Sequence, residues 1–372
     1  VSAAVAKAAI ESGVARKTIT DWDEYKNRLK QMLGQETKFT RTLHATAALH
    51  PQRVVFAEGG HQTMMKAAVT ALQEGICHPI LLGNPDRLNR LAKRLKLDLT
   101  GVEIVDMRAD KEQGRRATYA KHLAEKRARQ GVTFEEAYDK MYERNYFGMS
   151  MVEQGDADAF ITGLYTKYSN TIKVAKEVIG VRKDYNTFAT MHILNSKRGA
   201  IYVADTLINR HPNQDVLYDV ARLSEHTVKF FNQDPVIAMV SYSNFGTDEV
   251  GSPVAVHQAV EKLQHDFPDM VVDGEMQVNF ALNRELRDDK YPFTRLKGKD
   301  VNTIVFANMN AANSSYKLIQ ALDPDCEIVG PVQMGLNKPI HFTDFEASVS
   351  DVVNVTAVAV IDAYVDKVKN NK

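Results

Sequence analysis

Two carboxylates, Asp344 and Asp351, lie in a polar loop that joins an apolar run to an alanine- and valine-rich segment. The apolar run stops at Gly330-Pro331, which predicts a strand that ends in a turn. Ser348 precedes the alanine- and valine-rich segment and predicts the start of a helix. Loops of this kind hold anionic ligands in α/β proteins, because the first helical N–H groups are unpaired. The stretch 330–351 is therefore the first candidate site.

Polar residues follow or precede other predicted elements in the same way. Ser241 and Asn244 come directly after the apolar run 236–240, where a small-residue loop can offer backbone N–H groups to phosphate. An ordinary turn explains them equally well. Asn313 and Ser314 precede a helical pattern and can cap that helix or bind a diphosphate at its N-terminus. Capping is the simpler interpretation, and the two roles are compatible.

Short apolar runs that alternate with helical patterns predict the architecture. Several runs lack the alternation of a half-buried strand, as expected for strands covered on both faces. This pattern favours an α/β fold with mostly parallel, doubly wound sheets. The 372 residues exceed what one core usually organises and indicate two lobes. The runs are residues 54–57, 79–82, 103–105, 159–162, 200–204, 236–240, 270–274, 303–307 and 327–330.

Composition argues against several classes of protein. The formal net charge is +0, so no overall field favours nucleic acid. No apolar run reaches the roughly 18 residues of a membrane span. Cys77 and Cys326 form no metal-binding motif and suggest a reducing compartment, so we expect a cytoplasmic protein. His61 and His78 lie near strand ends without a second ligand, which favours structural or exposed histidines and no metal site. No Gly-x-Gly-x-x-Gly motif occurs.

The N-terminal text AKAAIESGVARKTITDWDEYKNRL resembles the closing segment of bacterial malic enzymes. Residues 1–31 read as helix, turn and helix, with Gly13 ending the first helix, and residues 32–50 read as a linker. The chain lacks an initiator Met, so we expect a piece of a longer protein whose malic enzyme domain lies upstream. That resemblance places NADP and a divalent metal in the upstream domain only.

Six blocks of the remaining chain resemble, in the same order, blocks of phosphate acetyltransferases, which move an acetyl group between coenzyme A and phosphate. The resemblance covers about 53–363 and implies the two-lobed fold of isocitrate and isopropylmalate dehydrogenases. The implied domain is 51–372, with lobes at about 51–180 plus 325–372 and at about 181–324. The blocks are VVFAEG (54–59), QGVTFEEAYDKMYERNYFGMSMVEQGDADAFITG (130–163), SYSNFG (241–246), DGEMQVNFAL (273–282), NMNAANSSYK (308–317) and GPVQMGLNKP (330–339).

The resemblance also implies roles for particular positions. Asp351 matches the family's Asp that acts on the thiol, whereas Asp344 and Phe345 replace the family's Ser-Arg pair. Lys173 replaces a second family Arg, and Arg127 matches a third in a looser alignment. We therefore expect no catalytic residues, and we expect acetyl-CoA to be bound by Arg127, Tyr165, Thr166, Lys173, Ser241, Asn244, Asn313, Ser314, Gln333, Asp344, Phe345 and Asp351.

Three functions follow as hypotheses. The first is a regulatory domain that binds acetyl-CoA as an effector, with inhibition as the expected sign and without turnover. The second is an active phosphate acetyltransferase that uses Asp351. The third is a module for assembly, with a homodimer formed through this domain, aided by the apolar helix at about 352–365, and a larger homo-oligomer in the full enzyme. Acetyl-CoA and the malic enzyme domain of the same chain are the expected partners, with no nucleic acid and no membrane.

Overall fold

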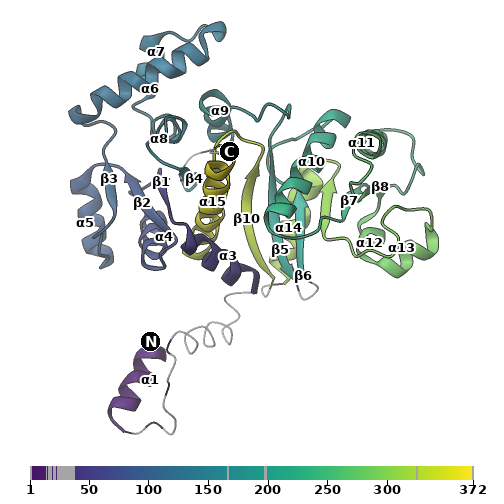
Figure 1. The fold of residues 1–372 in the computed structure, drawn as a ribbon, viewed down its shortest axis with the longest axis horizontal. Coiled ribbons are helices and arrows are strands. Elements are labelled where there is room, and N and C mark those ends of the chain that lie inside the picture. The colour runs from purple at the N-terminus through teal and green to yellow at the C-terminus, as the bar shows by residue number, and fades with distance from the viewer. Residues whose placement is uncertain are drawn as a thin grey trace.

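Two β-sheets organise the protein, one in each of the two lobes seen in Figure 1. The computed structural model describes residues 2–13, 15, 19, 22, 38–165, 167–196, 199–323 and 326–370. The first helix, α1 (Ser2–Glu11), ends before Gly13 as predicted. The predicted second helix of the N-terminal segment and its boundary with the linker lie outside the described residues.

The first sheet has five parallel strands in the order β11-β4-β1-β2-β3. The inner strands β1 and β4 are buried along almost their whole length, which explains why the apolar runs do not alternate. The strands are β1 (Gln52–Phe56), β2 (Cys77–Leu82), β3 (Glu103–Val105), β4 (Ala159–Thr162) and β11 (Ile340–Phe342). Helices α4 (Gln62–Gln73), α5 (Pro85–Leu95), α8 (Arg144–Glu153) and α9 (Tyr168–Val178) belong to this lobe.

The second sheet has six strands in the order β10-β5-β6-β9-β7-β8. Only the pairs β10-β5 and β5-β6 are antiparallel, so the two sheets are mostly parallel and confirm the predicted α/β class. The strands are β5 (Ala189–Ser196), β6 (Gly199–Ala204), β7 (Ile237–Val240), β8 (Val272–Met276), β9 (Thr303–Phe306) and β10 (Glu327–Met334). Its helices are α10 (Gln214–Phe230), α11 (Ser252–Asp266), α12 (Val278–Leu282), α13 (Arg284–Lys290) and α14 (Met309–Leu322).

The prediction that a strand stops at Gly330-Pro331 is wrong, because β10 continues to Met334. The register with β5 shifts between Val329 and Val332, so the proline lies at a bulge, where its missing N–H is tolerated. A Cβ atom on Gly330 would lie 3.0 Å from the Met191 carbonyl oxygen, so no larger residue fits this close approach. β10 lies in the second sheet, whereas we predicted that residues 325–372 belong to the first lobe.

One helix joins the two lobes. Helix α15 (Val349–Asn370) packs against β1, β4 and α4 of the first lobe and against β10 of the second, and it lies between the sheets in Figure 1. Its residues 352–360 are all buried in a core shared by both lobes. This apolar face is therefore used inside the chain over 352–360, and a contribution of the helix to a dimer stays a prediction.

Part of the predicted linker is an ordered helix. Residues 38–49 form α3 (Lys38–Leu49), which packs on α15 and buries Thr40, Leu43 and Ala47. The buried residues lie three and four positions apart, as expected for one face of a helix. The prediction that residues 32–50 form a linker is therefore wrong over 38–49, because α3 is part of the folded domain.

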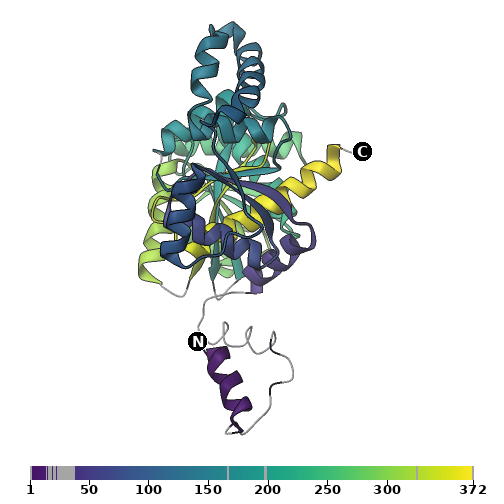
Figure 2. The same ribbon diagram turned by 90° about the vertical axis from the view of Figure 1, so that its left-hand side faces the viewer.

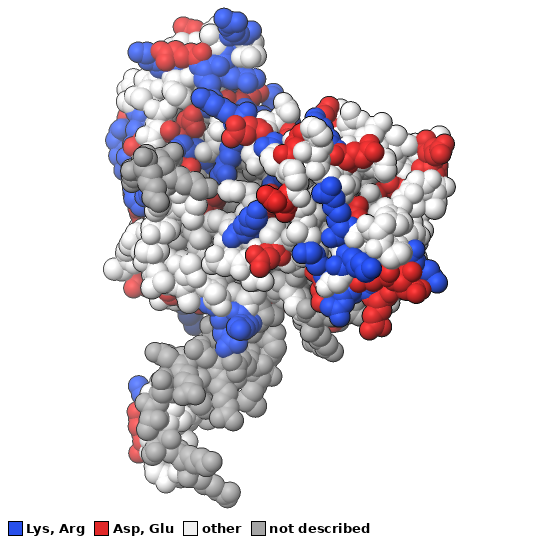
Figure 3. Space-filling model, turned by 45° about the vertical axis from the view of Figure 1, so that its right-hand side comes forward, with Lys and Arg blue, Asp and Glu red and all other residues white. Residues whose placement is uncertain are grey.

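A helical hairpin projects from the first lobe. Helices α6 (Gln113–Lys126) and α7 (Phe134–Lys140) stand at the top of the molecule in Figure 2, with the short turns η1 (Asp110–Glu112) and η2 (Ala128–Gln130) at the ends of α6. On the face shown in Figure 3, basic and acidic side chains are interspersed, as expected for a formal net charge of +0. No helix in the described part of the chain combines the length and apolar character needed to cross a membrane.

Candidate functional site

Side chains from both lobes meet around Gln333 near the end of β10. The Gln333 Nε2 atom donates a hydrogen bond of 3.2 Å to the Tyr168 hydroxyl at the start of α9. Asp344, which follows β11, pairs with Lys317 of α14 at 3.7 Å. His192 of β5 stacks on Tyr316, the neighbour of Lys317, with ring centroids 4.0 Å apart. We call Tyr168, His192, Tyr316, Lys317, Gln333 and Asp344 the interlobe cluster.

The charges of the interlobe cluster are largely matched within it. Burial raises the pKa of Asp344, while the charge of Lys317 opposes that shift. Burial, with a smaller contribution from Lys317, lowers the pKa of His192 to about 3, so the ring is neutral at physiological pH. Since Lys317 already faces a carboxylate, the cluster holds no spare cation for a dianionic phosphate. It offers hydrogen-bonding groups suited to amides and carbonyls instead.

Asp205, directly after β6, fixes the backbone beneath the cluster. Its Oδ1 atom accepts hydrogen bonds from the backbone N–H and hydroxyl of Thr190 and from the backbone N–H groups of residues 207 and 208. Its Oδ2 atom accepts from the backbone and side chain of Asn209. Asp205 therefore ties β5 to the loop after β6. The hydroxyl of the neighbouring Thr206 lies 2.9 Å from His192 Nδ1, so this contact links the loop after β6 to the interlobe cluster.

Asp351 has a structural role at the start of α15. The Asp351 carboxylate accepts a hydrogen bond of 2.8 Å from the Ser348 backbone N–H, and the Ser348 hydroxyl accepts one of 3.2 Å from the Asp351 N–H. This reciprocal pair is a capping box, and it confirms the predicted helix start at Ser348.

The capping box gives a test by substitution. Ser348→Ala is expected to lower the free energy of unfolding by about 1 kcal/mol, because it removes a helix cap. Urea unfolding measures the change. Ser350→Ala, an exposed position two residues further along the helix, is the matched control and is expected to leave the midpoint nearly unchanged. Equal effects of the two substitutions would contradict the capping role.

The structure brings together only some of the predicted ligand residues. Gln333 and Asp344 lie in the interlobe cluster, and the Asn313 side chain donates to the Thr206 carbonyl beside it. Phe345 follows Asp344 but is 74% exposed. Asn313 and Ser314 do not cap α14, because the helix begins earlier and Asn308 is its N-cap.

Other predicted residues lie apart from the cluster. Lys173 has a side chain that is 70% exposed and pairs with Glu177 along α9. Arg127 is the C-cap residue of α6. Ser241 and Asn244 follow β7, which β5, β6 and β9 separate from β10. Tyr165 is 59% exposed at the carboxyl end of the first sheet, and Thr166 lies outside the described residues.

Sequence reasoning missed Lys317, Tyr316 and His192. Lys317 and Tyr316 close the block NMNAANSSYK, in which Ala312 and Tyr316, four residues apart, form the buried face of α14. His192 lies in β5, a strand that none of the apolar runs predicted. His61, in contrast, is structural as expected, since its Nδ1 atom accepts from the Thr63 N–H and caps α4. Within the described residues, no group of three or more His, Cys, Asp or Glu side chains is placed to hold a metal ion.

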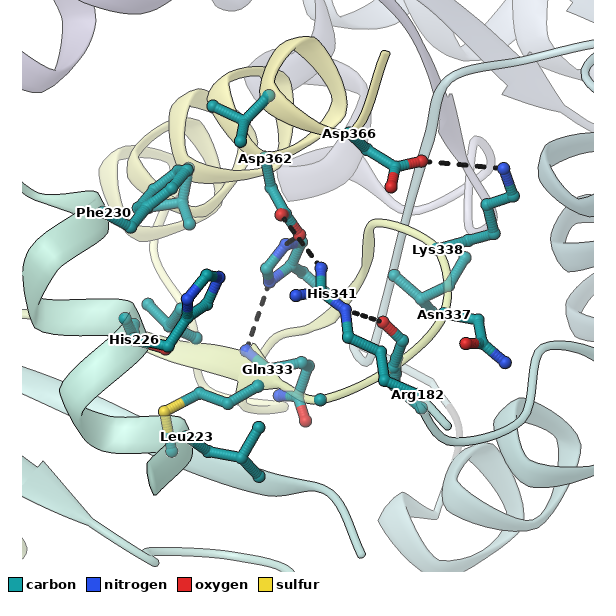
Figure 4. A pocket seen from close by; sticks show the side chains of 18 of the residues that line it. Arg182, Leu223, His226, Phe230, Gln333, Asn337, Lys338, His341, Asp362 and Asp366 are labelled. Carbon is teal, nitrogen blue, oxygen red and sulfur yellow. Dashed lines mark hydrogen bonds and ion pairs between the residues drawn. The ribbon is translucent and has the colours of Figure 1, made fainter. Parts of the chain in front are cut away.

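A cavity of about 410 Å³ is lined by Gln333 and lies between the 182–184 loop, α10 and α15. In Figure 4, Asp362 points toward His341 and Arg182, and Asp366 toward Lys338. His341 Nε2 lies 3.6 Å from Asp362, and the ion pairs of Arg182 and Lys338 measure 3.9 Å to Asp362 and 3.6 Å to Asp366. Because these cations face carboxylates, this cavity has little spare charge for an anion.

A buried glutamate joins two strands of the first sheet. Glu58, after β1, accepts hydrogen bonds from the Thr162 hydroxyl at 2.7 Å and from the Gly163 N–H at 3.2 Å, both at the end of β4. Burial raises the pKa of Glu58, while these hydrogen bonds and the Arg144 charge oppose the shift.

Glu58 predicts a specific pH dependence of stability. The folded protein holds this proton at pH values where the unfolded chain has lost it, so Glu58 lowers stability as pH rises above the ordinary glutamate range. Glu58→Gln keeps an acceptor and is expected to gain stability relative to the original chain on going from pH 5 to pH 8. Urea midpoints at the two pH values measure this. Exposed Glu125→Gln is the control, and parallel pH profiles for Glu58→Gln and the original chain would contradict the assignment.

Comparison with known proteins identifies the family of this fold. The sequence profile of the family "Phosphate acetyl/butaryl transferase" matches residues 38–360, and the chain belongs to this family. The chain is 34% identical over 367 residues to the NADP-dependent malic enzyme of Salmonella typhimurium, covering 98% of this chain and 48% of that protein. It is 30% identical to the phosphate acetyltransferase of Thermoanaerobacterium thermosaccharolyticum, covering 85% of this chain and 97% of that protein.

A solved phosphotransacetylase from Streptococcus pyogenes has the same fold, with a TM-score of 0.79 and 26% identity, covering 87% of this chain and 98% of that one. The chain spans about half the length of the malic enzymes that it matches. It is therefore a phosphate acetyltransferase-like domain of a kind that occurs within longer malic enzymes. The matching profile begins at residue 38, the first residue of α3, and so includes this helix in the family domain.

Proposed function

We propose that this chain is the regulatory domain of a longer malic enzyme and that it binds acetyl-CoA without transferring the acetyl group to phosphate. The observation that carries the proposal is the Asp344–Lys317 ion pair of 3.7 Å at the position where the family has its Ser-Arg pair. The pair occupies the nearby cation, and exposed Phe345 supplies none. The expected sign of regulation is inhibition.

Simple electrostatics supports the loss of phosphate chemistry. A phosphate oxygen about 4 Å from the Asp344 carboxylate meets a repulsion of about 4 kcal/mol per pair of unit charges at an effective dielectric constant near 20. Phe345 removes the two parallel hydrogen bonds that an arginine gives to phosphate. The capping box of Asp351 also weakens the alternative of an active transferase, because its carboxylate already accepts a backbone hydrogen bond.

The interlobe cluster suits the thioester end of acetyl-CoA. The Gln333 Oε1 atom is buried and has no hydrogen-bond partner within the described residues. A buried acceptor without a donor is costly, and the amide N–H groups of the pantetheine arm can supply one. When bound, acetyl-CoA would contribute these amides and an acetyl carbonyl. Gln333 and Tyr168 would then orient it between the lobes.

A metabolic argument connects this ligand to the longer enzyme. Malic enzymes form pyruvate, which feeds acetyl-CoA, so acetyl-CoA is a downstream signal that can restrain its own supply. The catalytic domain, with NADP and a divalent metal, would lie upstream in the same chain. Regulation requires that the effector bind two states of the whole enzyme with different affinity. We expect this in a cytoplasmic homo-oligomer.

An assembly role has one observation in its favour. Leu318, Ile319 and Leu322 on α14 are 59%, 41% and 75% exposed and form an apolar stripe. Such a stripe suits contact with a second copy or with the upstream domain. Light scattering with and without acetyl-CoA separates assembly from ligand sensing. If the mass changes with concentration but never with acetyl-CoA, assembly is the better account.

Calorimetry tests the binding step. Titration of the chain with acetyl-CoA is expected to give saturable heat. Gln333→Leu, which removes both hydrogen-bonding atoms, is expected to weaken binding about tenfold, the effect of one lost hydrogen bond of about 1.4 kcal/mol. Gln320→Leu, an exposed position on α14, is the control. A chain that gives no binding heat would remove the proposal.

A further inference from the structure

An open cavity of about 950 Å³ lies at the carboxyl edge of the first sheet. Its walls are the segments that follow β1, β2 and β3 and the first turns of α8 and α9. β1 has β2 on one side and β4 on the other, so the chain order reverses beside this cavity. Open α/β sheets bind their ligands at such a reversal, outside the carboxyl ends of the strands.

Three arginines line this cavity, and each comes from a different element: Arg87 from α5, Arg108 from the segment after β3 and Arg144 from the start of α8. Across the described residues, none of the three guanidinium groups has an ion pair or hydrogen bond. The Arg144 guanidinium lies over the Tyr165 ring, 5.6 Å from its centroid, and its charge also acts on Glu58 without forming an ion pair. Most arginines have a carboxylate or carbonyl partner in folded proteins, so three unpaired ones around one cavity point to an anion.

Within the described residues, the acids that line the cavity form no ion pair with these three arginines. Asp106 accepts from Asn84 Nδ2 at 3.2 Å and from the Arg108 backbone N–H at 3.1 Å, which leaves the Arg108 guanidinium unengaged. Glu143 is exposed. Glu58 is 1% exposed, and its Oε2 atom is buried without a hydrogen-bond partner in the part of the chain that the structure describes.

We propose that this cavity, the arginine pocket, binds the phosphate groups of an anionic ligand. The fork of each guanidinium matches two phosphate oxygens. Helix α8 begins at the cavity without a side-chain cap and adds its unpaired first N–H groups. In the cavity of about 410 Å³ beside α15, by contrast, Arg182 and Lys338 are paired with carboxylates.

The arginine pocket adjoins the interlobe cluster. Tyr165 lines the pocket and Tyr168 belongs to the cluster, and their Cα atoms are three chain steps, at most about 11 Å, apart. The phosphates can therefore be those of acetyl-CoA whose thioester lies in the cluster, or those of a separate phosphate ligand. The first source rests on the proposed function, whereas the second does not.

The test uses three probes on the whole chain: inorganic pyrophosphate, acetyl-CoA and S-acetylpantetheine, which carries the thioester without phosphates. Arg87→Gln and Arg144→Gln are each expected to weaken pyrophosphate binding at least about tenfold, as expected for a lost charged hydrogen bond. Arg94→Gln, on the same helix as Arg87 but outside the pocket, is the control and is expected to bind as the original chain does. Circular dichroism confirms that each variant is folded.

The pattern of losses identifies the source. If acetyl-CoA binding weakens together with pyrophosphate binding while S-acetylpantetheine binding is unchanged, the pocket holds the phosphates of acetyl-CoA. If only pyrophosphate binding weakens, the pocket serves a separate phosphate ligand. The proposal is overturned if the original chain binds no pyrophosphate, or if both arginine variants bind it as the control does. A chain that binds pyrophosphate but no acetyl-CoA contradicts the proposed function and leaves the pocket standing.

Discussion

A chain carrying Asp344→Ser together with Phe345→Arg is expected to form acetyl phosphate from acetyl-CoA and phosphate at least about tenfold above the original chain. The substitution removes a repulsion of about 4 kcal/mol per pair of unit charges and adds a bidentate arginine. It also frees Lys317, 3.7 Å from the Asp344 carboxylate, to face the phosphate. Rearrangement of the interlobe cluster offsets part of this favourable interaction energy, so tenfold is the lower limit.

Trapping acetyl phosphate as a hydroxamate measures this gain. Glu346→Ser is the matched control, since it removes a carboxylate from the same loop but is exposed and keeps Asp344 and Phe345. The control is expected to stay at the level of the original chain. If the double variant binds acetyl-CoA and still forms no acetyl phosphate, the loss of activity does not lie at these two positions.

Asp205→Asn is expected to lower the free energy of unfolding by about 3 kcal/mol or more. Both carboxylate oxygens accept hydrogen bonds from buried donors, so the amide of asparagine must turn its NH2 group toward at least one N–H. A buried donor left without an acceptor costs about 1–3 kcal/mol, and here more than one is affected. The substitution keeps the shape of the side chain, so no cavity adds to the loss.

Urea unfolding compares this variant with Asp300→Asn. Asp300 has a side chain that is 81% exposed and pairs with Arg284 at the surface, where such a pair contributes about 0–1 kcal/mol. Similar losses at both positions would mean that Asp205 does not hold β5 and β6 together in the way the hydrogen bonds indicate.

Local patterns were enough to predict most of the fold. The apolar runs became strands of the two sheets, all of them with a parallel neighbour except 327–330 in β10, and Ser348 capped α15 as expected. Strand β5 was not predicted, because its buried side chains include the polar residues Thr190, His192 and Asn195. Such side chains are acceptable in a core only when they have hydrogen-bond partners, such as Asp205 for Thr190 and Glu327 for Asn195. Those partners lie outside the strand in the sequence, so no local pattern predicts it.

The site could be predicted only in part for the same reason. The resemblance to phosphate acetyltransferases pointed to Gln333 and Asp344. The contacts that define the cluster join residues as much as 165 positions apart, as for Gln333 and Tyr168. Arg87, Arg108 and Arg144 are unremarkable in the sequence, and it is the parallel order of β1, β2 and β3 that brings them to one edge. Lys173 and Arg127, by contrast, matched family positions but lie apart from the cluster.

Proton NMR of acetyl-CoA in phosphate buffer tests the central claim most directly, because one spectrum reports binding and chemistry together. On addition of the chain, the acetyl methyl resonance is expected to broaden or lose intensity as the ligand binds, and no acetyl phosphate resonance is expected to appear with time. A sharp, unchanged methyl resonance would contradict binding. Growth of an acetyl phosphate resonance, abolished by Asp351→Asn, would instead identify an active transferase.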